Sequence, residues 1–487
     1  MPLLRHRRAP PPSSLWRAMS SAASGRRGYE AFGSFHTPSA AELFAGAAAS
    51  AAPSPASFLP PVPRERCHLD LSTFSTDAKQ LFTVDLQRWT YLNHGAFGGP
   101  TRYATQVASA WRAVADRQPL QFHDRQFFPY VVQSIQALAR FVGVSQPQEL
   151  VLLPNATAGL HAVLDSVVRA ELRRPGTAPV AVCCLSTRYG AVNKMLQQLA
   201  AEARSAAHGR SLEVHEVPLS LADSLDAAAV TAQLAAGLDA IRREHATDCS
   251  LVVVDHVTSN TGVLLPVEQI VRACHARGVP VLVDGAHALL NLPLALDELR
   301  ADYYVGNCHK WFASPRGAAF LHVRRAEVPL EPRVVSHGFF DGLQSAFMWQ
   351  GLQDYSAWLA LPQCIAFWEH QGVERCRSYM HALAQRAAEH LYAAWDMPEQ
   401  LARDASHARH AMRLVLLPSR RLFGVDVNQP AGNSSADAKH IQDTLHHAHQ
   451  IEVPVKCVEG RLYVRLSAHI YNELEDYDRL ARAIAGG

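Results

Sequence analysis

Short apolar runs alternate with amphipathic stretches through the middle of the chain. Val151–Leu153, Val180–Leu185, Leu251–Asp255 and Val279–Val283 have the length and composition of buried strands. Pro266–Arg277, between the last two runs, is predicted as a crossover helix. Strands and helices in this order predict an α/β fold, with a mostly parallel sheet covered by helices on both faces.

The pattern changes beyond Arg325. Met412–Leu417 and Ile451–Val464 are predicted as strands, with Ala436–His449 as a helix between them, which indicates a smaller α+β domain at the C-terminus. The chain is therefore divided into an N-terminal extension (1–85), a large domain (86–330) and a small domain (331–487).

The N-terminal extension has a composition of its own. Met1–Arg27 contains six arginines and several serines, with no acidic residue before Glu30, as is typical of an organelle transit peptide. A disordered basic tail fits equally well, and Met19 could be an alternative start. Residues 34–66, rich in Ala, Ser and Pro, are predicted as a linker. The predicted location is a mitochondrion or plastid, or otherwise the cytoplasm.

Composition excludes several classes of partner. A formal charge of +2 gives no reason to expect binding to nucleic acid, and no apolar run is long enough to predict a membrane span, so a soluble protein is expected. The nine cysteines are scattered without a CxxC spacing, which argues against a disulfide framework. No metal site is expected either, although one segment is rich in histidine (His440, His446, His447 and His449).

The candidate chemistry lies at the ends of two successive strands. Val279–Val283 is closed by Asp284, and Lys310 follows on the next strand and turn, between His309 and Trp311. In open α/β sheets the carboxyl ends of the strands carry the ligands. A lysine and an acid there suit pyridoxal phosphate (PLP): the amine forms a Schiff base with its aldehyde, and the carboxylate keeps its pyridine nitrogen protonated. Singly, the acid could cap a helix and the lysine could be a surface charge.

A second segment offers a site for an anion. Asn155–Thr157 opens a predicted helix, and free N–H groups beside a Thr hydroxyl would suit a phosphate. By itself this is a common N-cap. The Gly-rich turn in Tyr91–Pro100 and the strand-closing Arg465 carry no specific signal on their own.

Taken together, these segments resemble the class V aminotransferase family. DGAHAL stands where the family has D-G-A-[QH], and NCHKW stands where it has [ST]-x-H-K. YLNHGAFGG, VDHVTSNTG and the C-terminal VRLSAHIYNELEDYDRLARAI are most similar to the branch of isopenicillin N epimerases, cysteine desulfhydrases and hercynylcysteine sulfoxide lyases. The resemblance covers about Tyr91 to Ile484 and implies a fold-type I PLP enzyme, a homodimer that acts on a small amino-acid substrate.

The resemblance also implies roles for residues. Lys310 and Asp284 are the expected catalytic residues, and Tyr189 is expected to stack on the cofactor ring. Ser259 or Asn260, between which the alignment is ambiguous by one position, would reach the cofactor O3′, as would His287. The full set of expected contacts comprises Ala156, Thr157, Tyr189, Ser259, Asn260, Asp284, His287, Asn307, His309 and Lys310 for the cofactor, and Asn93, His94 and Arg465 for the substrate.

One motif departs from the family. Ser345–Leu361 resembles the W-x-G-T-x-D segment that a neighbouring subunit contributes to the phosphate site. Trp349, Gly351 and Asp354 are retained, but Leu352 replaces the usual Thr and removes a hydroxyl donor. The predicted contact across the subunits is therefore in doubt.

The expected reaction is β-elimination at a C–S bond of a cysteine-type substrate. Epimerisation or racemisation, transamination, and a non-catalytic binding protein on the same fold are the alternatives. Neither Gly-rich nucleotide fingerprint occurs. Persulfide formation is not expected, because Cys457, the cysteine nearest Arg465, lies in a predicted hairpin rather than in a long mobile loop.

Overall fold

A computed structural model describes residue 32 and residues 35–46, 54–71, 77–205, 210–245, 248–324, 328–397 and 409–487. The predicted transit peptide, Met1–Arg27, lies outside the described residues. No helix in the described ranges has the length and apolar character needed to cross a membrane.

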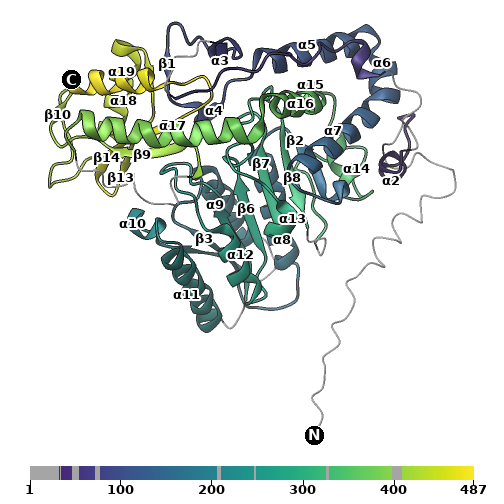
Figure 1. Ribbon diagram of the computed structural model, residues 1–487. Coiled ribbons are helices and arrows are strands. Elements are labelled where there is room, and N and C mark those ends of the chain that lie inside the picture. Colours follow the sequence, from purple (N-terminus) through teal and green to yellow (C-terminus); the bar gives the residue numbers. More distant parts are fainter. Residues whose placement is uncertain are drawn as a thin grey trace.

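A seven-stranded sheet carries the predicted lysine and acid (Figure 1). Its strand order is β2-β8-β7-β6-β5-β3-β4. All neighbours are parallel except β8, which is antiparallel to both β2 and β7. The strands are β2 (Leu150–Leu153), β3 (Val180–Leu185), β4 (Leu212–Val217), β5 (Cys249–Asp255), β6 (Val281–Gly285), β7 (Tyr303–Asn307) and β8 (Ala319–Val323).

Helices cover both faces of this sheet, because successive side chains of a strand point to opposite faces. On β6, Leu282 packs with α8 (Ala156–Leu172) and α9 (Gly190–Ser205). Val281 and Val283 belong to the core on the other face, which includes α7 (Phe127–Phe141), α11 (Ala227–His245) and α12 (Val267–His275). The predicted α/β class with a mostly parallel sheet is confirmed.

The predicted strands differ from the observed ones mainly at their ends. Val180–Leu185 coincides with β3, whereas β6 begins two residues later than predicted. Val279 and Pro280 precede the ladder because proline has no N–H to donate. The polar edge strand β4 and the antiparallel β8 were not predicted, since neither shows a long apolar run.

A three-stranded antiparallel sheet, in the order β13-β14-β9, forms the second core. The predicted strand Ile451–Val464 divides into β12 (Ile451–Glu452), β13 (Val455–Val458) and the start of β14 (Arg461–Ser467). The long helix α17 crosses between the two cores, with Met380 in the first and Leu391 in the second (Figure 1). Further elements here are β9 (Met412–Leu416), α17 (Val373–Ala394), α18 (Ser435–His449) and α19 (Leu474–Ala485).

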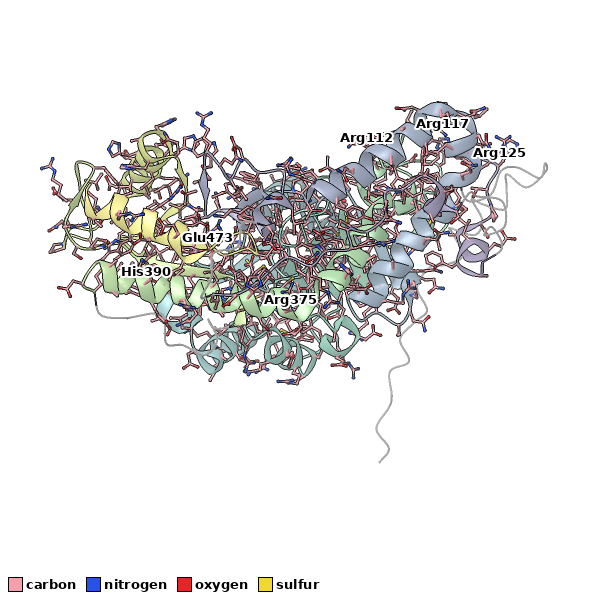
Figure 2. The ribbon with its side chains drawn as sticks, turned by 45° about the horizontal axis from the view of Figure 1, so that its top comes forward. Arg112, Arg117, Arg125, Arg375, His390 and Glu473 are labelled. Atoms are coloured by element: carbon pink, nitrogen blue, oxygen red, sulfur yellow. The ribbon has the colours of Figure 1, made fainter. Side chains whose placement is uncertain are left out.

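Described parts of the N-terminal extension pack against the rest of the chain. Leu43 of α2 (Ala40–Phe44) is buried, and the backbone N–H and Nδ1 of His36 each lie 2.8 Å from a carboxylate oxygen of Asp124. Lys79 pairs with Glu473, which Figure 2 labels. The described part of the predicted linker 34–66 is thus held in place, while the domain boundaries at 85 and 330 stay predictions.

The remaining elements are short, apart from α5 and α16. They are the 3₁₀ turns Pro55–Ser57 and Pro147–Glu149, the π-helical turn Phe122–Gln126, α3 (Asp77–Gln80), β1 (Thr90–Tyr91), α4 (His94–Phe97), α5 (Arg102–Arg117), α6 (Pro119–Gln121), α10 (Leu221–Ser224), α13 (Leu296–Leu299), α14 (Leu343–Met348), α15 (Ser356–Leu359), α16 (Leu361–Gln371), β10 (Arg421–Leu422) and β11 (Val425–Asp426). β1 pairs in parallel with β12, so the segment before the Gly-rich turn joins the C-terminal part of the chain.

Candidate active site

The predicted acid and lysine lie at one edge of the large sheet. Asp284 is near the end of β6, Lys310 follows the end of β7, and these parallel strands are neighbours. The Lys310 amine lies 3.3 Å from Nε2 of His287, whose Nδ1 accepts a hydrogen bond from the indole N–H of Trp311 (3.3 Å). The structure therefore brings Asp284, His287 and Lys310 together, as predicted.

Burial keeps the Lys310 amine in a reactive state. It lowers the pKa of Lys310 to about 8; Asp284 opposes this shift and Arg465 adds to it. Burial, with the nearby Lys310 charge, also lowers the pKa of His287 well below its ordinary value. Since the Nδ1 of neutral His287 accepts from Trp311, its proton is on Nε2 and points at the amine. A neutral amine is the form that attacks an aldehyde.

A second buried acid, Asp255, was missed by the sequence analysis. It ends β5 and pairs in register with Asp284 on β6, and its side chain is almost fully buried. Its Oδ2 has no hydrogen-bond partner among the described residues. Burial and the neighbouring Asp284 raise the pKa of Asp255 well above its usual range. The signal was present in the sequence, because LVVVD and VPVLVD both end in an acid.

Burial also raises the pKa of Asp284, whereas the backbone N–H of Ala286, which donates to its Oδ1 (3.0 Å), and the Lys310 charge lower it. The Asp284 charge is a further cause that raises the pKa of Asp255, whereas Asp255 does not raise that of Asp284 in return. The pair is therefore best described as one carboxylate, on Asp284, beside one protonated carboxyl, on Asp255.

The start of α8 offers the predicted anion site. Asn155 caps the helix by accepting from the N–H of Ala158 (2.9 Å), and the N–H of Ala156 donates to Oδ1 of Asn307 at the end of β7 (2.9 Å). Asn307 thus fixes the helix start beside the Lys310 segment. Thr157, in the first turn, is exposed, so its hydroxyl is accessible. The N-terminus of a 17-residue helix suits a phosphate group.

Arg465 is a buried cation without a carboxylate. It is 4% exposed on β14 and donates to the Ser259 carbonyl and to Oδ1 of Asn93 (3.2 Å). Its Nε has no partner, and no carboxylate among the described residues lies within ion-pairing distance of it. Burial lowers the pKa of Arg465 to about 10. An incoming carboxylate would supply the missing partner.

Asn93 is placed by the same network. Its side-chain amide donates to Oε1 of Glu452 (3.1 Å) while its oxygen accepts from Arg465. Glu452, which the sequence analysis did not identify, therefore fixes the direction of the Asn93 amide.

His94 does not face a substrate, contrary to the prediction. It is fully buried, and burial with the nearby His469 lowers its pKa well below the usual range, so the ring is neutral. Its Nε2 donates to the Lys310 carbonyl (3.0 Å), and its Nδ1 accepts from the Tyr471 hydroxyl (2.9 Å). Both nitrogens are thus used, and His94 positions the backbone of Lys310.

The Gly-rich turn supports the same backbone. Gly98 has φ +68°, and a Cβ there would lie 2.1 Å from the carbonyl oxygen of His309. Only glycine fits this close approach. The Nδ1 of His309, in turn, donates to the Ala318 carbonyl (3.2 Å).

The remaining cofactor predictions are not settled by these contacts. Tyr189 is 43% exposed and lies just before α9, so its ring is accessible for stacking. The backbone carbonyl of Ser259 is engaged by Arg465, and Asn260 is exposed. Contacts of Tyr189, Ser259 and Asn260 with the cofactor stay predictions.

The W-x-G-T-x-D-like segment is buried at Trp349 and exposed from Leu352 to Asp354. Trp349 is buried and stacks with Tyr355 (ring centroids 5.4 Å apart). Asp354 accepts from the Ser356 N–H and pairs with Arg112 of α5 (2.7 Å; Figure 2). Leu352 is 74% exposed, so the residue that replaces Thr is free to meet another surface.

These groups fit PLP and an amino acid. An amine with a lowered pKa, an acid near it and a helix N-terminus match the aldehyde, the ring nitrogen and the phosphate of PLP, and Arg465 matches an α-carboxylate. The orphaned charge on Arg465 and the orphaned Oδ2 of Asp255 show that the site is built for polar groups that the chain itself does not supply.

Known proteins are similar to this chain in sequence. Residues 124–480 match the model of the family described as aminotransferase class-V. An L-cysteine desulfhydrase of Arabidopsis thaliana is 28% identical, covering 81% of this chain and 86% of the relative. An isopenicillin N epimerase of Streptomyces clavuligerus is 28% identical, covering 81% and 93%.

A solved structure has the same fold. It is a mutant of C-DES with glycine covalently linked to its PLP cofactor; it is 22% identical, covers 84% of this chain and 99% of its own, and superposes with a TM-score of 0.63. The family match spans most of the chain and includes the acid, the lysine and the arginine of the site. This chain therefore belongs to the class-V aminotransferase family.

Proposed function

We propose that this protein is a PLP-dependent carbon–sulfur lyase that eliminates the sulfur substituent from Cβ of a cysteine-type amino acid. The observation that carries the proposal is that one site contains two buried cationic side chains. One is Lys310, which is readily deprotonated, and the other is Arg465, which has no carboxylate partner among the described residues. The names of relatives support the choice of substrate, since one is an L-cysteine desulfhydrase.

Each residue has a distinct task. Arg465 binds the α-carboxylate and so orients the substrate amine and Cα toward Lys310. Thr157 and the start of α8 would hold the phosphate of PLP, next to Ala156, whose own N–H is engaged by Asn307. Asp284 would hold a proton on the ring nitrogen. When bound, PLP supplies an aldehyde that links to an amine and a ring that accepts the electron pair of a broken Cα–H bond.

The proton transfers follow from the state of Lys310. Its amine takes the proton from Cα, the Cβ–S bond breaks, and the sulfur leaves as a thiolate that is then protonated. The released aminoacrylate hydrolyses to pyruvate and ammonia, so L-cysteine gives sulfide, pyruvate and ammonia. His287 donates toward the amine from Nε2 and helps to keep it unprotonated before the reaction.

The test is to incubate the holoenzyme with L-cysteine and S-substituted cysteines while following pyruvate, sulfide and enantiomeric composition together. Pyruvate and thiol in equal amounts are expected. Loss of optical purity without pyruvate would instead indicate epimerisation. A protein that binds no PLP and gives no product would contradict the proposal and indicate a binding protein.

Persulfide transfer is not part of this proposal. Cys457 lies on β13, paired in register with Leu462 of β14, and its thiol lies 3.1 Å from the Asn433 carbonyl. Glu459 and Gly460 close the hairpin with φ of 51° and 72°, the conformation of a tight two-residue turn. The predicted hairpin is confirmed, and a thiol fixed on it cannot carry sulfur between sites.

We also propose that the protein is a homodimer. Val334, Val335, Phe340 and Leu352 are large apolar side chains that are 53–74% exposed within one stretch of the chain. A second copy would cover them, and Leu352 lies within the segment Ser345–Leu361 that resembles one donated to a neighbouring subunit. Mass measurement in solution should give a dimer that Phe340→Asp weakens, whereas Leu120→Asp, on the exposed α6, should leave it intact.

The organelle location is also our proposal. It rests on the arginine- and serine-rich composition of Met1–Arg27. A fluorescent protein carrying residues 1–60 should localise to a mitochondrion or plastid, and one whose sequence starts at Met19 should not. Cytoplasmic fluorescence from both would contradict it.

A further inference from the structure

A cavity of about 580 Å³ lies between the two cores, next to the proposed carboxylate site. Its walls come from the loop after β3, from Asn260 and Thr261, from α18 and from the hairpin residues 455–459. Asn260 directly follows Ser259, whose carbonyl accepts from Arg465. The cavity and the proposed carboxylate site are therefore neighbours, joined through Ser259 and Asn260.

Lys456 lines this cavity without an ion pair, and Glu459, which also lines it, accepts instead from the N–H of Leu221. Lys456 is partly buried on β13, and it forms no hydrogen bond or ion pair with any residue in the described part of the chain. Lys456 pairs in register with Tyr463, so its side chain shares a sheet face with Tyr463 and Arg465. Such diagonal neighbours have Cα atoms about 7–8 Å apart. Burial and the Arg465 charge both lower the pKa of Lys456.

A second lysine provides the comparison. Lys439 of α18 lines the same cavity, but its amine contacts both oxygens of Asp443, at 3.0 and 2.7 Å. Only Lys456 of this pair is left with a charge to offer a ligand. Two neighbouring cations without an anion repel one another, and a ligand carrying two negative groups would relieve both.

We infer that Lys456 binds a second anionic group on the substrate, so that the preferred substrates are cysteine S-conjugates whose sulfur substituent ends in a carboxylate or a similar acid. This inference rests on the proposed function, because it assumes that Arg465 takes the α-carboxylate. The cavity then holds the leaving group, and Lys456 selects it by charge.

The test compares two nearly isosteric substrates on the holoenzyme, S-carboxymethyl-L-cysteine and its neutral S-carbamoylmethyl analogue. The wild type should show a kcat/KM for pyruvate release about tenfold or more higher with the acid. Lys456→Gln should abolish that preference, chiefly by lowering kcat/KM for the acid. Lys456→Arg should keep the preference, as should the matched control Lys439→Gln.

Equal kcat/KM values in the wild type, or a preference that survives Lys456→Gln, would overturn the inference. If the preference for the acid survives Lys456→Gln and this variant also forms a weaker dimer, Lys456 pairs with a partner subunit instead. If neither conjugate releases pyruvate, the proposed function fails separately. The subsite is then still tested by binding: L-glutamate should titrate the cofactor absorbance at lower concentration than L-glutamine, and Lys456→Gln should remove the difference.

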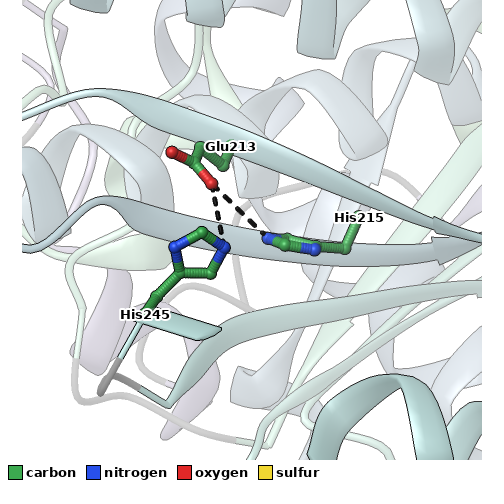
Figure 3. Close-up of side chains that lie close together, drawn as sticks. All are labelled: Glu213, His215 and His245. Atoms are coloured by element: carbon green, nitrogen blue, oxygen red, sulfur yellow. Dashed lines mark ion pairs between the residues drawn. The ribbon is translucent and has the colours of Figure 1, made fainter. Parts of the chain in front are cut away.

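A different observation concerns the edge strand β4, far along the sheet from Lys310. Glu213 and His215 lie two residues apart on β4, and His245 ends α11 (Figure 3). Oε2 of Glu213 is 3.0 Å from Nε2 of His245 and 3.8 Å from Nε2 of His215. The Nε2 of His215 is buried and has no hydrogen-bond partner in the described ranges, and burial lowers the pKa of this ring.

The geometry points to a Zn²⁺ site formed by Glu213, His215 and His245. All three candidate ligand atoms lie within 4.8 Å of one another, and two imidazoles with one carboxylate form a typical zinc donor set that leaves a position for water. The buried Nε2 of His215 has no hydrogen-bond partner among the described residues, so it is available to a metal ion. The sequence predicted no metal site anywhere in the chain, so this inference departs from that prediction. In the His-rich segment considered there, His446 is hydrogen-bonded to Glu452 and His440 to the Phe423 carbonyl.

Zinc competition against a chromophoric chelator, on the holoenzyme, tests this site. One zinc per chain is expected, lost in His215→Ala and in His245→Ala and retained in the control His447→Ala on α18. Pyruvate release should not change on zinc removal, because the site is separate from Lys310. Unchanged stoichiometry in both histidine variants would show adventitious binding and overturn the assignment.

Discussion

Replacing Arg465 by Met should lower the catalytic efficiency strongly while changing the unfolding free energy little. In the wild type the guanidinium is 4% exposed and lacks a carboxylate partner among the described residues. Burial lowers its pKa from 12.5 to about 10, which corresponds to roughly 3 kcal/mol for keeping the charge in the protein. Met removes that cost but leaves two acceptors without a donor, the Ser259 carbonyl and Asn93 Oδ1, at about 1–3 kcal/mol each.

These opposing terms nearly cancel, so the unfolding free energy of Arg465→Met should stay within about 2 kcal/mol of the wild type. Substrate binding has no such compensation. Losing a buried charged contact to the α-carboxylate should cost about 2–5 kcal/mol of transition-state stabilisation. This corresponds to a kcat/KM lower by roughly 30-fold to 5,000-fold. PLP content should not change, because the cofactor contacts lie elsewhere in the site.

Denaturant unfolding, PLP absorbance and initial rates of pyruvate release measure the three quantities on one preparation. Arg465→Lys is the matched control, because it keeps the charge but loses the bidentate geometry, and it should recover only part of the rate. If Arg465→Met turns over L-cysteine at the wild-type rate, or if amines without a carboxylate react as well as amino acids in the wild type, Arg465 has another role.

Four further outcomes are expected. Lys310→Ala should lose turnover and the visible absorbance band of bound PLP; PLP that borohydride still attaches to this variant would refute the assignment. Asp284→Asn should keep PLP but lose several kcal/mol of transition-state stabilisation, as measured by kcat; a near-wild-type rate would exclude its role. Cys457→Ser should retain sulfide release, and complete loss with PLP bound would indicate persulfide chemistry. PLP uptake by the apoenzyme should speed up as pH rises, with a midpoint near 8, because only the neutral Lys310 amine reacts; a rate independent of pH from 7 to 9 would show that its pKa is not lowered.

The parts of the site that the sequence predicted are those set by local patterns. Asp284 and Lys310 could be placed together because apolar runs mark parallel strands, and parallel strands present their carboxyl ends at one edge. The hairpin that holds Cys457 was predictable for a similar reason, since Glu459 and Gly460 interrupt an apolar run where a tight turn is needed.

The missed parts depend on contacts between residues far apart in the chain. Nothing near Asn93 in the sequence shows that its amide joins Arg465 to Glu452. His94 was misjudged because a histidine beside a Gly-rich turn can face a substrate or the core, and only the fold decides. Here it stacks on His469, with ring centroids 3.9 Å apart.

These long-range contacts determine how the two halves of the site are held together. Lys310 follows a strand of the large sheet, whereas Arg465 belongs to the small sheet, so one substrate can engage both only if the sheets keep a fixed relation. His469 bonds to the Trp311 carbonyl (2.9 Å), and the N–H of Gly95 donates to the Ser467 hydroxyl (3.2 Å). Each contact ties the chain just after Arg465 either to the Lys310 segment or to the Gly-rich turn beside it. These hydrogen bonds therefore fix the distance between Arg465 and the Lys310 amine. The buried histidines His94 and His469 contribute to this by bonding to backbone carbonyls of the Lys310 segment.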